Sequence, residues 1–104
     1  MTTELLLKLT RWAHEDPSDE IVQANLALAG AGAEAYLAGA DVPMGEDMRE
    51  EDVPLRELTV LKLALYFYEV RAADPRYGYV SLPPDLNHLV NSLRSAPRRK
   101  EGSA

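Results

Sequence analysis

The chain lacks several residue types on which common enzyme activities depend. Its 104 residues include no cysteine, and His14 and His88 are the only histidines. The absence of cysteine excludes disulfides and thiolate metal sites, and it fits a reducing compartment. Neither histidine has a partner at metal-ligand spacing, and no Gly-x-Ser-x-Gly turn is present. We therefore expect no enzyme, no cofactor and no metal site.

Long apolar segments are also missing. The most apolar run, residues 58–70, is interrupted by Lys62 and Glu69 and is shorter than the ~20 residues that cross a bilayer. The leucines at 5–7 are followed at once by Lys8, unlike the apolar segment of a signal peptide. These features predict a soluble protein that does not contact a membrane.

Charge is present but unevenly distributed. Residues 1–52 carry twelve acids and three bases, whereas residues 53–104 carry five acids and eight bases. This polarity has two interpretations: solvated faces, or acidic surface that meets basic surface on another copy or a partner. The net charge of −6 argues against tight sequence-specific DNA binding, which needs clustered Lys and Arg.

Helix signals predict an all-α fold, a small bundle of about four helices in which a long second and third helix pack antiparallel. The first helix is expected over residues 3–14, with Trp12 as an anchor in the core. The second is expected from about residue 17 to residue 38, with Asp16 as its N-cap. Its middle consists almost entirely of small residues.

Two glycines lie inside this second helix, Gly30 and Gly32. Each costs roughly 1 kcal/mol relative to alanine in a helix interior. Such a cost predicts that another helix approaches there too closely for a side chain. A nucleotide-binding loop is a poor interpretation, because no strand precedes these glycines.

The third helix is expected to open at Asp52-Val53-Pro54 and to end before Asp74-Pro75. Its apolar stripe is Leu55, Leu58, Leu61, Leu65 and Tyr68, and the stripe is widened by Val60, Leu63, Ala64 and Phe67. A helix with so much apolar circumference must be covered on several sides, by the first two helices and by a partner. A fourth helix starts at Leu82-Pro83-Pro84, with a stripe formed by Leu86, Leu89, Val90 and Leu93.

These helices define one domain over residues 1–96, followed by a disordered basic tail over 97–104. Residues 40–52 are expected to form a long acidic loop, which contacts a neighbour or lines a channel. Its candidate residues are Glu46, Asp47, Glu50, Glu51 and Asp52. They lack the spacing of a calcium-binding loop.

Aromatic residues supply the candidate interface. Three successive rings at 66–68 cannot all face inward from one helical turn, so at least one is expected at a surface or interface. The candidate interface residues of the third helix, the following loop and the fourth helix are Tyr66, Phe67, Tyr68, Arg71, Tyr77, Tyr79 and Pro83.

The order of several short motifs carries a family resemblance. They are an acid early in the second helix, Tyr-Leu near its end, Leu-Lys-x-Ala and Tyr-Glu-x-Arg in the third helix, and Leu-Pro before the last. The matching residues are Asp19, Tyr36, Leu37, Leu61, Lys62, Ala64, Tyr68, Glu69, Arg71, Leu82, Pro83 and Arg94. In this order they resemble the small head–tail connector, or head-completion adaptor, proteins of long-tailed phages and prophages. The chain departs from the family pattern at Val70, where asparagine is usual. It also departs at Pro84, where a small or aromatic residue is more usual after Leu-Pro.

The resemblance implies a non-enzymatic structural subunit of the virion. Copies of it would form a ring below the portal, extend the DNA channel and offer an attachment platform for head-completion or tail proteins. Its expected partners are other copies, the portal protein, a head-completion or tail protein, and DNA that passes without sequence-specific binding. Its expected location is the head–tail interface of the virion, after the host cytoplasm.

Two other functions remain open. A small acidic helical interaction module, such as an antitoxin or an inhibitor subunit, would share this composition. It would form a tight one-to-one complex or a dimer rather than a ring. A nucleic-acid accessory protein would use the basic tail, Arg98, Arg99 and Lys100, and its DNA binding would be sensitive to salt.

Overall fold

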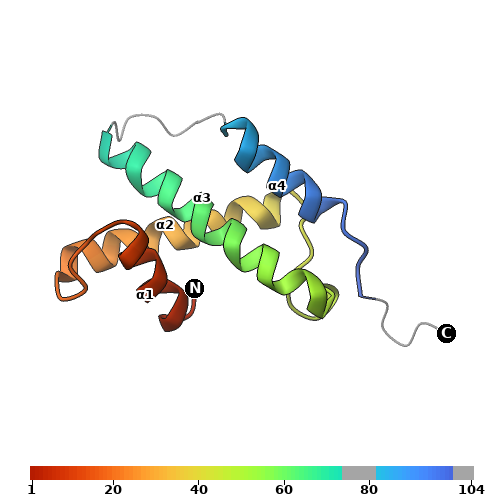
Figure 1. The fold of residues 1–104 in the computed structure, drawn as a ribbon, viewed down its shortest axis with the longest axis horizontal. Helices are drawn as coiled ribbons and strands as arrows, with labels where there is room; N and C mark the ends of the chain where they lie inside the picture. The colour runs from red at the N-terminus through yellow and green to blue at the C-terminus, as the bar shows by residue number, and fades with distance from the viewer. Residues whose placement is uncertain (74–81, 100–104) are drawn as a thin grey trace.

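The computed structural model describes residues 1–73 and 82–99, with side chains for all of these except 71–73. This part of the chain forms four α-helices and two short 3-10 turns: α1 (Thr3–Trp12), α2 (Glu20–Gly39), η1 (Gly45–Asp47), η2 (Glu50–Asp52), α3 (Val53–Ala73) and α4 (Pro84–Arg94). The two long helices, α2 and α3, run in opposite directions and form the main helix contact (Figure 1). The expected all-α bundle with antiparallel long helices is therefore confirmed.

The helix starts follow from local capping. The Thr2 hydroxyl accepts a hydrogen bond from the Leu5 amide at 3.2 Å and begins α1. The Asp19 carboxylate accepts from the Ile21 and Val22 amides at 3.0 and 3.1 Å. Asp19, and not Asp16, is thus the N-cap of α2.

The expected start of α2 near residue 17 is wrong because Asp16 is already engaged. Its carboxylate accepts hydrogen bonds from both the amide and the hydroxyl of Ser18, at 2.9 and 2.8 Å. These bonds lower the Asp16 pKa, with the bond from the Ser18 amide contributing most. They also form a separate turn, so the helix opens at the next suitable acid.

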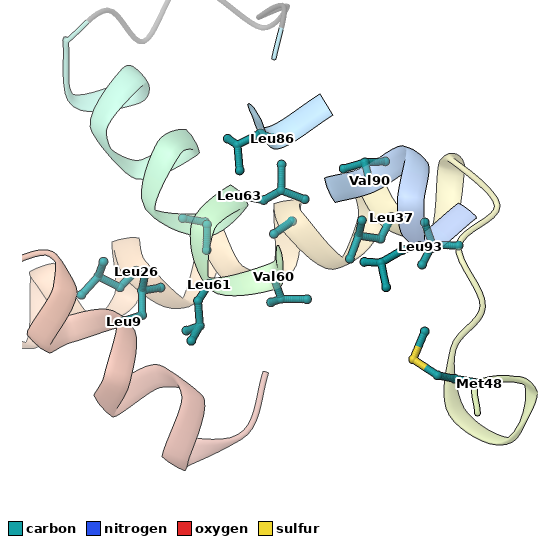
Figure 2. Close-up of a cluster of buried hydrophobic side chains, with 14 residues drawn as sticks. Leu9, Leu26, Leu37, Met48, Val60, Leu61, Leu63, Leu86, Val90 and Leu93 are labelled. Atoms are coloured by element: carbon teal, nitrogen blue, oxygen red, sulfur yellow. The ribbon is translucent and has the colours of Figure 1, made fainter. Parts of the chain in front are cut away.

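The core runs along the contact between α2 and α3 and is closed at its two ends by α1 and α4. At one end Leu9 of α1 lies with Leu26 and Leu61, and at the other Leu37 of α2 lies with Val90 and Leu93 of α4 (Figure 2). Trp12 is not a core anchor, because 39% of it remains exposed. It is the last residue of α1, whereas Leu9 and Thr10 are the residues that this helix buries.

The buried face of α3 is centred on the residues expected to widen its stripe. Val60, Leu63 and Ala64 are at most 1% exposed. Leu58, a member of the expected main stripe, is 36% exposed. The buried Thr59 hydroxyl donates to the Leu55 carbonyl at 2.8 Å, so this polar group is satisfied within the helix.

The two glycines of α2 have different surroundings from those expected. A Cβ on Gly30 would lie 2.8 Å from the Sδ and Cε of Met1, so the space is filled by a flexible side chain and not by a helix backbone. A Cβ on Gly32 would lie 3.7 Å from Cδ2 of Phe67, which is ordinary contact. Neither glycine is therefore required by close packing of helices within the chain.

Candidate interaction surfaces

The aromatic residues of α3 contact neighbouring elements of the same chain. The Phe67 ring packs edge-on against Tyr36 of α2, with centroids 6.1 Å apart, and lies at the same centroid distance from Tyr66. Tyr68 of α3 lies near Glu15 in the turn before α2, whose negative charge adds to the effect of burial in raising the Tyr68 pKa. Tyr66, Phe67 and Tyr68 are all half-buried. These rings join α3 to the rest of the bundle, and only their outer edges are available to a partner.

The environment of Tyr68 changes its acidity. Its pKa is raised, first by burial and then by the negative charges of Glu15 and Asp19. A deprotonated Tyr68 would place a third negative charge beside these two carboxylates. The packing of α3 on the turn before α2 therefore favours the neutral phenol.

Among the other candidate interface residues, Pro83 is half-buried and precedes α4 as its N-cap. Tyr77 and Tyr79 lie outside the described residues, as does the side chain of Arg71.

The acidic loop between α2 and α3 is anchored by apolar residues. Val42, Pro43 and Met48 are buried beneath it. Of the five candidate acids of this loop, Glu46, Asp47, Glu50 and Glu51 are exposed and Asp52 is half-buried. Because the loop is fixed from below, its carboxylates point outward from one edge of the bundle.

A half-buried ion pair fixes the same region from the side. Arg56 of α3 contacts the Glu34 carboxylate of α2 at 2.9 Å, and its Nε donates to the Pro43 carbonyl at 3.2 Å. The Arg56 side chain is only 14% exposed. This one guanidinium therefore joins α2, the loop and α3.

The C-terminal segment lies along the acidic loop. The Arg98 guanidinium contacts the Asp41 carboxylate at 2.9 Å and that of Asp47 at 3.8 Å. The Arg99 amide donates to the Asp47 carbonyl at 2.7 Å, and Met48 and Arg98 form an antiparallel bridge. Arg98 and Arg99, which belong to the expected basic tail, thus contact the loop.

The most exposed large apolar residues lie on the outer face of α2. Ile21 is 74% exposed and Leu28 is 58% exposed, more than any other large apolar side chain of the described residues. On the same face lie exposed alanines, which complete a set spaced alternately by three and four residues: Ile21, Ala24, Leu28, Ala31, Ala35 and Ala38. We call these six residues the outer seam of α2. None of them is charged.

The outer seam of α2 is not among the predicted surfaces, although its spacing is present in the sequence. Both sides of α2 are apolar, because the inner side carries Leu26, Ala29, Ala33 and Leu37, all buried. A helix that is apolar all round gives no periodic signal for which side faces the core. The alternating spacing at residues 21–38 was the signal that could have identified the seam.

Within 1–73 and 82–99, no group of three or more acidic or histidine side chains is placed to hold a metal ion. No helix in those ranges is both long and apolar enough to traverse a membrane. Comparison with protein-family models, with curated proteins and with solved structures finds no match to this chain.

Proposed function

We propose that this chain is a structural subunit of a phage or prophage head–tail connector. Copies of it form a ring below the portal, extend the DNA channel and offer an attachment platform to the next head-completion or tail protein. The observation that carries this proposal is the order of the short motifs between Asp19 and Arg94, which resembles the connector pattern. The four-helix order and the long antiparallel pair are compatible with it.

Exposed surface of two kinds supports a role in assembly. The outer seam of α2 is apolar and uncharged, whereas the anchored loop presents Glu46, Asp47, Glu50 and Glu51 to solvent. Exposed apolar residues gathered on one helix face are typical of surfaces that contact other proteins. A ring requires a heterologous contact between two different surfaces of the subunit, and a chain with distinct apolar and charged surfaces can supply one.

The acidic loop has a specific part in the proposal. Carboxylates lining a channel offer no counter-charge to DNA phosphates, so DNA slides past without being held. Exchanging these four exposed acids for amides should leave the ring intact and slow DNA passage. Unchanged DNA passage in such a ring would contradict this part of the proposal.

The proposal is tested by imaging the purified chain alone and with a candidate portal protein. Mass photometry gives the stoichiometry, and negative-stain microscopy gives the shape. Rings with a central hole in the portal sample are the expected result. A chain that stays monomeric or dimeric in both samples would contradict the connector proposal.

The second candidate is a small helical interaction module, favoured by the size of the exposed apolar residues on α2. It would bind one partner tightly through that face. A pull-down with the wild-type chain and with Leu28→Glu tests this candidate. The wild-type chain should capture one partner without forming a ring, and Leu28→Glu should fail to capture it.

A further inference from the structure

We propose that the free chain forms an antiparallel dimer in which the outer seams of α2 from two copies pack together. The seam has the alternating three- and four-residue spacing of a coiled-coil contact. Ile21, Leu28 and Ala35 occupy one kind of seam position, and Ala24, Ala31 and Ala38 the other. This inference goes beyond the connector proposal, which concerns the assembled particle.

Side-chain size selects a second copy as the occupant. In an antiparallel pair, each seam position of the first kind faces one of the second kind. When Leu28 lies opposite Ala31 of the second copy, Ile21 lies opposite Ala38 and Ala24 opposite Ala35. Every large side chain then meets an alanine, which permits close approach of the two helices. The seam is therefore complementary to itself.

Charge selects the antiparallel over the parallel arrangement. A parallel pair would place Asp19 and Glu20 of both copies side by side, where like charges repel. In the antiparallel register, Glu34 lies beside Ala27 of the second copy. Glu20 lies level with Gly39, the last residue of α2 in the second copy. No unpaired acids are brought together.

The size of the seam limits the strength of the dimer. Residues 21–38 span about 26 Å of helix at 1.5 Å per residue. Each copy contributes two large apolar side chains and four alanines, so the buried area falls below the ~1,200 Å² of a standard interface. The dimer is therefore weak and reversible, and it can dissociate when a subunit joins a ring. A twofold contact closes on itself, whereas a ring needs a heterologous one.

Disulfide trapping tests the register, because the chain has no cysteine of its own. One sample mixes Ala24→Cys chains with Ala35→Cys chains, and two control samples contain each variant alone. Both positions are exposed, so the substitutions leave the core intact. The antiparallel register predicts linked dimers in the mixture. It predicts almost none in the controls, because like positions lie eleven residues, about 16 Å, apart along the helix.

Sedimentation velocity over a range of concentrations tests the surface itself. Leu28→Glu should weaken dimerisation by about tenfold or more, because it buries a charge against the second copy. Leu7→Glu, the same change at a 42% exposed leucine of α1, should leave dimerisation unchanged. Efficient crosslinking of Ala24→Cys alone, no crosslinking in any sample, or equal effects of the two glutamates would overturn the proposal.

The outcomes for the dimer and for the connector are separable. A strictly monomeric chain that still forms rings with a portal overturns the dimer and leaves the connector. A seam dimer that never joins a portal overturns the connector and leaves the dimer.

Discussion

The two faces of α2 are similar in composition and opposite in environment. The inner face buries Leu26 and Leu37 completely, whereas the outer face leaves Ile21 at 74% and Leu28 at 58% exposed. Both faces combine two large aliphatic side chains with alanines. The difference shows that the fold of the chain covers one apolar face of this helix and leaves the other exposed. The exposed face is suited to contact between molecules.

The difference between the two faces should appear first in stability. The largest effect is expected for Leu26→Ala compared with Leu28→Ala. Leu26 is fully buried, so its truncation should lower the free energy of unfolding by about 3 kcal/mol through lost burial and a cavity. Leu28→Ala should lower it by less than about 1 kcal/mol. Urea denaturation at low protein concentration measures both, and equal losses would show that the two faces are not distinct.

The boundary between the faces is tested at the Arg56–Glu34 pair. Arg56→Met removes the guanidinium from a half-buried carboxylate and from the Pro43 carbonyl. We expect a loss of about 1–3 kcal/mol in unfolding free energy. Arg49→Met is the control, because the Arg49 side chain is 35% exposed whereas that of Arg56 is 14% exposed. If Arg49→Met lowered the unfolding free energy as much as Arg56→Met, the proposed role of Arg56 in joining α2, the loop and α3 would be contradicted.

A smaller effect of opposite sign is expected at Gly32. An added Cβ would lie 3.7 Å from Phe67, so alanine fits without rearrangement. Gly32→Ala should therefore raise the unfolding free energy by about 0.5–1 kcal/mol. Gly30→Ala should gain less, because the Met1 side chain must move from a position 2.8 Å away. Thermal unfolding measures the stability of both variants. A loss of stability in Gly32→Ala would contradict the ordinary contact distance between position 32 and Phe67.

The smallest effect concerns alkaline pH. The Tyr68 pKa is raised in the folded chain, mainly by burial and then by Glu15 and Asp19. The folded state therefore holds the phenolic proton to higher pH than the unfolded state does. Stability should be complete below the ordinary tyrosine pKa of about 10 and fall as pH rises above it. Tyr68→Phe should flatten this part of the pH profile in urea titrations, and an unchanged slope would contradict the assignment.

Much of the fold could be predicted from the sequence, because prolines, acids and apolar spacing determine the helices locally. The details that failed depend on contacts distant in sequence. Trp12 is expected in the core because it shares a face with Leu9, but it is the last residue of α1 and 39% of it remains exposed. Asp16 has the chemistry of an N-cap, yet Ser18 engages it first.

The candidate surfaces were harder to predict. The acidic loop was recognisable from composition, but its contact with Arg98 joins Asp41 to a residue 57 positions away. The outer seam of α2 was missed because both sides of the helix are apolar. Only the tertiary contacts with α3 show which side remains uncovered.

The most direct test of the account is sedimentation of the wild-type chain and Leu28→Glu over about a hundredfold range of concentration. The account predicts that the wild-type sedimentation coefficient rises from that of a monomer to that of a dimer. The variant should show the same rise only at concentrations at least about tenfold higher, with an unchanged unfolding free energy at low concentration. Identical, concentration-independent coefficients for the two chains would contradict the claim that the outer face of α2 is a contact surface.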